Sequence, residues 1–134
     1  MPKVSLQLTV EDIGTTEAFY GGILELAVSR IISAPGSPDL LVIRQGDWEL
    51  VFAEENAIVR AHPILEERFS SFPKGVGVIL RCAVTGLEEI SDALIEEGIE
   101  MLYPLSQQRF GEKELWCFDP DGYLVVLVEI VRKE

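Results

Sequence analysis

The chain has 134 residues and a formal net charge of −12 at pH 7, and 48% of its residues are hydrophobic. This size and composition predict one soluble globular domain that is large enough to bury a substantial core. The negative charge argues against binding to a nucleic-acid backbone, because phosphates would be repelled and few cations are available to release counterions. It is compatible with a cationic ligand, although acidity also keeps a protein soluble.

The start of the sequence, MPKVSLQLTVEDIG, alternates between apolar and polar residues and does not have the pattern of a secretory signal. No apolar run approaches the length needed to cross a bilayer. We therefore expect a cytoplasmic protein that binds neither nucleic acid nor membranes. Cys82 and Cys117 both fall inside strand-like runs and outside any C-x-x-C pair, so we expect buried thiols and not a disulfide or a metal clip.

The first part of the chain predicts a strand, a helix and three further strands. Alternation of apolar and polar residues indicates a half-buried strand over Lys3–Val10. The stretch EDIGTTEAFYGGILEL follows, and its acidic residues and threonines suit a helix N-terminus. The turn sequences APGSPD and QGD then separate three strands, which we expect at Ala27–Ser33, Leu40–Arg44 and Trp48–Ala53.

The pattern lapses between Glu54 and Gly75, where we expect a long connection with one short helix, either a lid or a plain linker. The plan then repeats. GVGVILRCAV predicts a strand, and TGLEEISDALIEEGIEML predicts a helix that is capped by Thr85 and closed by Gly98. Three strands follow, at Glu100–Pro104, Lys113–Phe118 and Tyr123–Val131.

Sliding the sequence on itself by 74 residues lays Val10 on Val84 and Ile13 on Leu87, which indicates an internal duplication. The predicted fold class is α+β, with two βαβββ modules in a single domain of residues 1–134. The modules cover about residues 1–54 and 75–134, and the connection 55–74 joins them. Each module has a sheet with one face covered by its helix, so the other face must be buried or must form a cleft.

Two stretches resemble the vicinal oxygen chelate superfamily, which includes glyoxalase I, extradiol dioxygenases, fosfomycin-resistance enzymes and bleomycin-resistance proteins. VEDIGTTEAFYGGILEL is similar to the start of the first module of these proteins, and FGEKELWCFDPDGYLVVLVE is similar to their last hairpin. The resemblance covers nearly the whole chain in the right order. It implies that the curled mixed sheets of the two modules form a cleft, and that the protein is a homodimer.

Metal-binding members of this superfamily carry one ligand on the first and last strand of each module, and the resemblance places these four positions at Ser5, Glu49, Ile79 and Val126. A shift of 74 residues relates the first and third positions, and a shift of 77 relates the second and fourth, as a duplication requires. Only Glu49 is a strong ligand, because Ile79 and Val126 have no donor atom and a serine hydroxyl is a poor substitute. We therefore expect neither a bound metal nor another cofactor.

Strand alternation adds Gln7, Arg81, Trp116 and Phe118 to the predicted lining of the cleft. An apolar and aromatic wall with a few polar groups is typical of a small-molecule pocket. Trp116 either stacks on a planar ring or a cation, or fills the core of the sheet. Glu49 and Arg81 either neutralise each other, or Glu49 is partly desolvated, so that its pKa rises and it can act as a general base.

The leading hypothesis is a metal-free small-molecule-binding protein, similar to bleomycin-resistance proteins, that sequesters a cationic or aromatic compound without altering it. No catalytic residue is assigned, and the ligand-binding residues are predicted to be Ser5, Gln7, Glu49, Ile79, Arg81, Trp116, Phe118 and Val126.

Two alternatives remain. The first is a metal-dependent lyase, isomerase or dioxygenase of the same superfamily, in which the strands are misaligned and the ligands are Gln7 in place of Ser5 or Glu129 in place of Val126. Alternation argues against Glu129, because this residue would then share a face with Val125 and Leu127. The second alternative is a structural or regulatory protein that uses the cleft for a peptide or another subunit.

Overall fold

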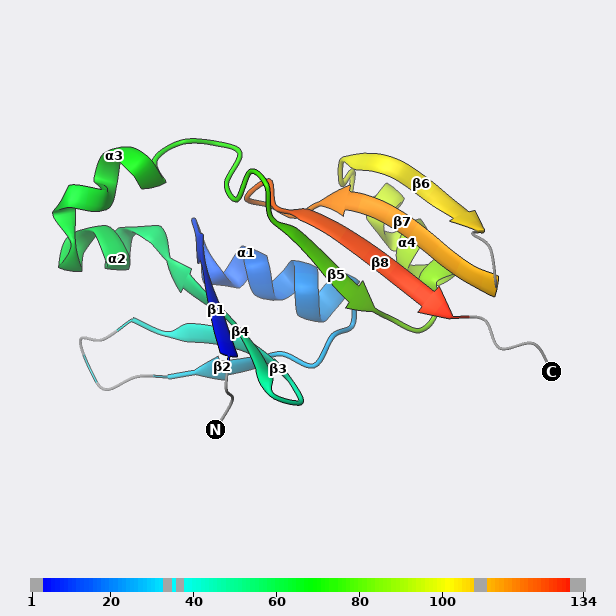
Figure 1. The fold of residues 1–134 in the computed structure, drawn as a ribbon, viewed down its shortest axis with the longest axis horizontal. Helices are drawn as coiled ribbons and strands as arrows, with labels where there is room; N and C mark the ends of the chain where they lie inside the picture. Colours follow the sequence, from blue (N-terminus) through cyan, green and yellow to red (C-terminus); the bar gives the residue numbers. More distant parts are fainter. Residues whose placement is uncertain (1–3, 33–34, 36–37, 108–110, 131–134) are drawn as a thin grey trace. The chain divides into compact units, whose positions relative to one another are not determined.

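The computed structural model describes residues 4–32, 35, 38–107 and 111–130. The chain forms two compact units, Met1–Lys74 and Gly75–Glu134. In its described part, each unit has a four-stranded mixed sheet with a helix against one face (Figure 1). The predicted α+β fold class with two βαβββ modules is therefore confirmed. Three predicted strand ends lie outside the described residues: Lys3, Ser33 and Val131.

The first unit has the sheet order β1-β4-β3-β2, in which β1 and β4 are parallel and the other neighbours are antiparallel. Its elements in chain order are β1 (Val4–Val10), α1 (Ile13–Glu17), the π-helix η1 (Ala18–Ile23), β2 (Ser29–Ile31), β3 (Leu40–Gln45), β4 (Trp48–Glu54), α2 (Glu55–Ala61), the 3₁₀-helix η2 (Pro63–Leu65) and α3 (Glu66–Phe69). The connection after β4, where the sequence predicted one short helix, thus holds α2, η2 and α3.

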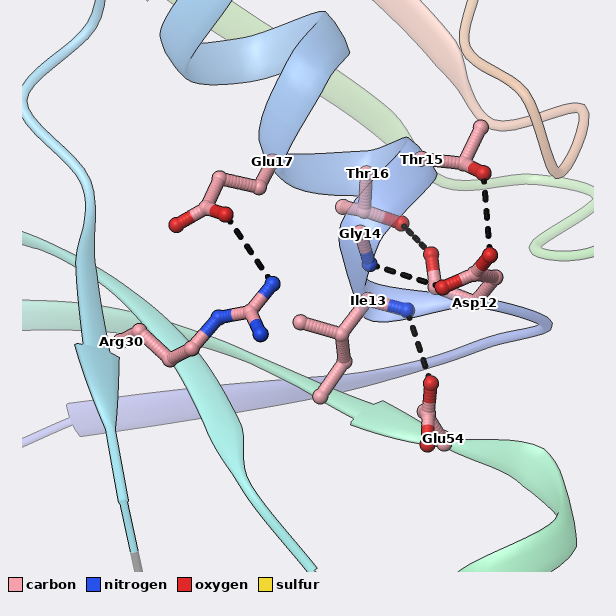
Figure 2. Close-up of polar contacts among 8 residues, drawn as sticks. All are labelled: Asp12, Ile13, Gly14, Thr15, Thr16, Glu17, Arg30 and Glu54. Atoms are coloured by element: carbon pink, nitrogen blue, oxygen red, sulfur yellow. Dashed lines mark hydrogen bonds and ion pairs between the residues drawn. The ribbon is translucent and has the colours of Figure 1, made fainter.

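Two carboxylates hold the start of the first helix (Figure 2). Asp12 is the N-cap residue, and its side chain accepts hydrogen bonds from the Gly14 amide at 2.8 Å and the Thr15 hydroxyl at 3.3 Å. Glu54, at the end of β4, accepts a hydrogen bond from the Ile13 amide at 3.0 Å. The first amides of a helix have no partner within the helix, so these bonds satisfy the donors and tie α1 to the sheet.

Aromatic packing shows which side of the first sheet meets the helix. The Tyr20 ring of η1 lies 4.8 Å from the Phe52 ring of β4, and both side chains are fully buried. Because side chains alternate along a strand, Phe52 and Glu54 lie on the helix-packing face and Glu49 lies on the opposite face. The face of each sheet that points away from its helix is termed the far face below.

The second unit repeats the plan with the sheet order β5-β8-β7-β6, and β5 is parallel to β8. Its elements are β5 (Ile79–Ala83), α4 (Leu87–Glu96), β6 (Met101–Gln107), β7 (Glu112–Phe118) and β8 (Leu124–Ile130). Figure 1 shows α4 against one side of β6, β7 and β8. Within the described residues, no helix of either unit is long and apolar enough to span a membrane.

Contacts with α4 identify the two faces of the second sheet. Lys113 of β7 donates a hydrogen bond to Glu88 of α4 at 2.8 Å. The fully buried residues on the same face of β7 and β8 are Leu115, Cys117, Val125 and Leu127. The intervening residues, which include Trp116 and Val126, therefore lie on the far face, in agreement with the alternation in the sequence.

The segment before β5 is a turn and not part of the strand that the sequence predicted from Gly75 onward. Gly75 and Gly77 have φ angles of 68° and 94°, and the Val78 amide donates to the Gly75 carbonyl at 2.8 Å. Positive φ angles are incompatible with a regular strand, so β5 begins only at Ile79.

Thr85 does not cap α4, which corrects a second prediction. The N-cap residue is Gly86, with a φ angle of 69°. The carboxylate of Glu129 on β8 accepts hydrogen bonds from the amides of Gly86 at 2.6 Å and Leu87 at 3.2 Å. This arrangement matches that of Glu54 in the first unit, so the internal duplication extends to the way in which each sheet holds its helix.

Candidate functional site

Glu49 lies on the far face of the first sheet, and one residue of each neighbouring strand lies beside it. It is the register partner of Ser5 on β1 and of Arg44 on β3. Arg44 Nε donates to Glu49 Oε2 at 2.8 Å, and the Ser5 hydroxyl donates to Oε1 at 3.4 Å. The Glu49 side chain is only 16% exposed, and Arg44 compensates its charge. Gln7 lies further along the same face of β1, opposite Val51.

Three rows of side chains cross the far face of the second sheet. The central row consists of Arg81, Val126, Trp116 and Tyr103, one from each strand. A second row consists of Ile79, Leu124 and Phe118. The third consists of Ala83, Val128, Glu114 and Ser106. The far face thus joins five of the predicted site residues, which are Ile79, Arg81, Trp116, Phe118 and Val126.

A hollow of about 410 Å³ lies on this far face and is lined by Tyr103, Pro104, Ser106, Glu114 and Trp116. The Tyr103 and Trp116 rings meet edge to face, with centroids 5.4 Å apart and an interplanar angle of 77°. Two aromatic walls and a carboxylate form a surface that can hold a planar ring and that favours a positive charge.

Arg81 and Glu114 form an ion pair at the edge of the hollow. Arg81 Nη1 lies 3.5 Å from Glu114 Oε1, and the two side chains are 59% and 19% exposed, respectively. One of the two sequence hypotheses was that Arg81 and Glu49 neutralise each other. In the structure each of them has a partner within its own unit, Glu114 for Arg81 and Arg44 for Glu49.

The strand register corrects the alignment of the two modules. Ser5 faces Glu49, whereas Ile79, the counterpart of Ser5, faces Leu124 and not Val126. The glutamates that bind the helix amides give the same alignment. Glu54 lies five residues after Glu49, and Glu129 lies five residues after Leu124. The shift that relates β4 to β8 is therefore 75 residues and not the 77 predicted.

The side chains at these positions do not fit a divalent cation. Ile79, Leu124 and Val126 offer only hydrocarbon, and Glu49 is already engaged in an ion pair. Within the part of the chain that the structure describes, no three His, Cys, Asp or Glu side chains are grouped as a metal would require. Glu129, the alternative ligand, points to the helix-packing face, where it binds the amides of α4.

Sequence reasoning missed Arg44, Glu114 and Tyr103. Glu114 could have been found, because it lies two residues before Trp116 and therefore on the same face. Arg44 could also have been found, because a two-residue turn at Gly46 places it opposite Glu49. Tyr103 gave no such signal, since register shifts on both sides of it interrupt the pairing of β6 with β7.

The sequence matches the family described as the Glyoxalase/Bleomycin resistance protein/Dioxygenase superfamily over residues 4–127. The chain therefore belongs to this superfamily, and the resemblance to the vicinal oxygen chelate proteins is confirmed at that level. A search of curated proteins found no match.

Solved structures share the fold at low sequence identity. A protein of unknown function from Agrobacterium tumefaciens str. C58 is 21% identical, with a TM-score of 0.67 and coverage of 98% of this chain and 95% of that one. Hypothetical protein SA1046 from S. aureus is 16% identical, with a TM-score of 0.66 and coverage of 92% and 89%. A glyoxalase/bleomycin resistance protein/dioxygenase family enzyme from Burkholderia phytofirmans PsJN is 15% identical, with a TM-score of 0.65 and coverage of 95% and 97%.

Proposed function

We propose that this protein binds a small aromatic compound, preferably a cationic one, without the help of a metal ion. The observation that carries the proposal is the hollow on the far face of the second sheet, where Tyr103 and Trp116 form the walls and Glu114 supplies a carboxylate. A planar ring gains apolar contact with the walls, and a positive charge on it is attracted by the ring faces and by Glu114. The net charge of −12 draws cations toward the protein at long range.

The donor set supports binding without a metal. Of the four positions that correspond to metal ligands in the superfamily, only Glu49 carries a strong ligand, and it forms an ion pair with Arg44 at 2.8 Å. We assign no bond-breaking step to these residues. The proposed role is sequestration of the ligand.

Tryptophan fluorescence offers a direct test, because the chain has only two tryptophans. In the Trp48→Phe variant, Trp116 is the single tryptophan reporter. We expect 1-methylquinolinium to quench its emission saturably, at submillimolar concentration, in protein treated with EDTA. Isothermal titration should then show weaker binding by at least about fivefold in Trp116→Ala, since stacking contacts of this kind contribute about 1 kcal/mol or more. Trp48→Phe alone is the matched control and should bind like the native protein.

Two results would contradict the proposal. One is the absence of binding to any member of a panel of cationic and neutral aromatic compounds. The other is binding that EDTA abolishes and a divalent ion restores, which would favour the metal-dependent lyase, isomerase or dioxygenase instead.

We also propose that the protein is a homodimer. Support comes from the apolar residues that the first unit leaves exposed on the helix-packing face of β1 and β4, namely Val4, Leu6 and Trp48. Burial of such a patch by a second copy would stabilise both subunits. Size-exclusion chromatography with light scattering should give twice the mass of the 14.9 kDa chain, and a monomeric mass would refute the proposal.

A further inference from the structure

We propose that Arg81 limits the preference of the hollow for cationic ligands, because it occupies the Glu114 carboxylate in the free protein and must give up this position to the positive charge of a bound ligand. The inference rests on the proposed function and adds to it the residue that competes with the ligand.

The two partners of this ion pair have unequal surroundings. Glu114 belongs to the lining of the hollow, and its side chain is only 19% exposed. Arg81 is not part of the lining, and its side chain is 59% exposed. The carboxylate is therefore a fixed part of the binding surface, whereas the guanidinium is already largely hydrated and can turn into solvent at little energetic cost.

The geometry of the contact is loose. Arg81 and Glu114 are not register partners: Arg81 lies in the row of Val126, and Glu114 lies in the next row, opposite Val128. The guanidinium reaches the carboxylate diagonally, and the N–O distance of 3.5 Å is at the outer limit for a hydrogen bond.

The far face of the first sheet provides the contrast. Arg44 and Glu49 are direct register partners, and their contact is 2.8 Å. Glu49 and Glu114 are nearly equally covered, at 16% and 19% exposed, so the carboxylates alone do not explain the difference. The position of the arginine distinguishes the two pairs, and Arg81 is the one that is more easily displaced.

Displacement of Arg81 gives a ligand two interactions at once. A cation in the hollow can contact the Glu114 carboxylate and the ring face of Trp116 in the same place, whereas Arg81 approaches Glu114 from outside the hollow. A neutral ring does not need Glu114, so the ion pair persists beside it. The protein therefore prefers cationic to neutral rings, and Arg81 reduces this preference by competing for Glu114.

The test compares 1-methylquinolinium with quinoline, a neutral ring of similar shape at the pH used, by isothermal titration. Arg81→Gln should increase the affinity for 1-methylquinolinium by about fivefold, which corresponds to the loss of one exposed ion pair, and should change the affinity for quinoline by less than about twofold. Glu114→Gln should lower the affinity for the cation and leave that for quinoline nearly unchanged. Because Arg81 is exposed, the variant should fold, and an unchanged melting temperature verifies this.

Lys113→Gln is the matched control. Lys113 precedes Glu114 on the same strand but points to α4 on the opposite face, so its removal changes the net charge equally without touching the hollow. An equal gain of affinity in Lys113→Gln and Arg81→Gln would overturn the proposal, as would the absence of a gain in Arg81→Gln when the native protein binds both probes. If the native protein binds neither probe, the proposed function itself fails, and the role of Arg81 fails with it.

Discussion

Glu129 accepts a 2.6 Å hydrogen bond from the amide of Gly86, at the point where the last strand passes the start of α4. The Leu87 amide donates to the other oxygen of the same carboxylate at 3.2 Å. A side chain from a distant strand thus does the work that a Ser, Thr, Asp or Asn cap does in most helices. The bond fixes α4 on the sheet that carries the hollow.

Replacement of Glu129 by alanine should lower the free energy of unfolding by about 2 kcal/mol, because two amides lose a charged acceptor. Urea unfolding followed by circular dichroism measures the change. Glu96→Ala, at the exposed end of α4, is the control and should shift the midpoint only slightly. Equal effects of the two substitutions would mean that the Glu129 bonds contribute nothing beyond a surface charge.

Gly75→Ala should destabilise the protein by more than about 2 kcal/mol, because strain and a steric clash add together. Gly75 has a φ angle of 68°, and a Cβ atom at this position would lie 2.2 Å from the buried Tyr123 ring. Gly46 separates the two terms, because its φ angle is 56° but no atom lies within 4 Å of its added Cβ. Gly46→Ala should therefore cost about 1 kcal/mol, the strain alone. Thermal unfolding of both variants tests the difference, which equal melting temperatures would disprove.

Both cysteine thiols should be unreactive in the folded protein. Burial raises the pKa of Cys82 from 9.0 to about 11. Burial, followed by the negative charge of Asp119, raises the pKa of Cys117 to about 12. At about pH 8 we expect iodoacetamide to label neither thiol in native protein and both in guanidinium, because only the thiolate reacts. Rapid labelling of the native protein would contradict this.

The same pKa shifts predict the alkaline limit of stability. Because the folded state holds the thiol protons more tightly than the unfolded state, the free energy of unfolding should be independent of these groups below pH 9.0. It should then fall as the pH rises toward the folded values of about 11 and about 12. Cys82→Ala should reduce the slope of this decline, which urea unfolding at several alkaline pH values can measure.

Lys113 should control the ionisation of Glu88. Their 2.8 Å hydrogen bond, together with the attraction between the charges, lowers the pKa of Glu88 below its usual value of 4.5. The resulting stabilisation is present above pH 4.5 and is lost as the pH falls through the lowered pKa of Glu88. Carboxyl NMR titration of Lys113→Gln should return the pKa of Glu88 to its ordinary range, whereas Arg81→Gln, which leaves Lys113 in place, should not.

Alternation and turn chemistry in the sequence were sufficient to predict the two modules and the faces of their strands. The period of two assigned Trp116 and Val126 to one face and Glu129 to the other, because successive side chains of a strand point to opposite faces of the sheet. The low identity of the two halves did not hide this pattern. The order of strands and helix in each half can therefore be predicted from local patterns in the sequence.

Features that depend on contacts distant in sequence could not be predicted in this way. Thr85 is a residue type that often caps a helix, but here the Glu129 carboxylate of the last strand accepts the hydrogen bond from the Leu87 amide instead. The register between β5 and β8 places Leu124, and not Val126, opposite Ile79, and this pairing of distant strands has no signal in the local sequence pattern. Tyr103 lines the hollow at a place where the pairing of β6 with β7 is irregular, and no periodicity in the sequence indicates this irregularity.

Every hydrogen bond and ion pair described above joins two residues on the same side of the boundary between Lys74 and Gly75. A cut of the backbone at this boundary would sever none of them. Each half carries its own sheet, its own helix and its own anchoring glutamate, so a gene split at this place would encode two pieces that each keep the bonds described above. Selection could accordingly reshape the far face of one half while the other keeps its sequence.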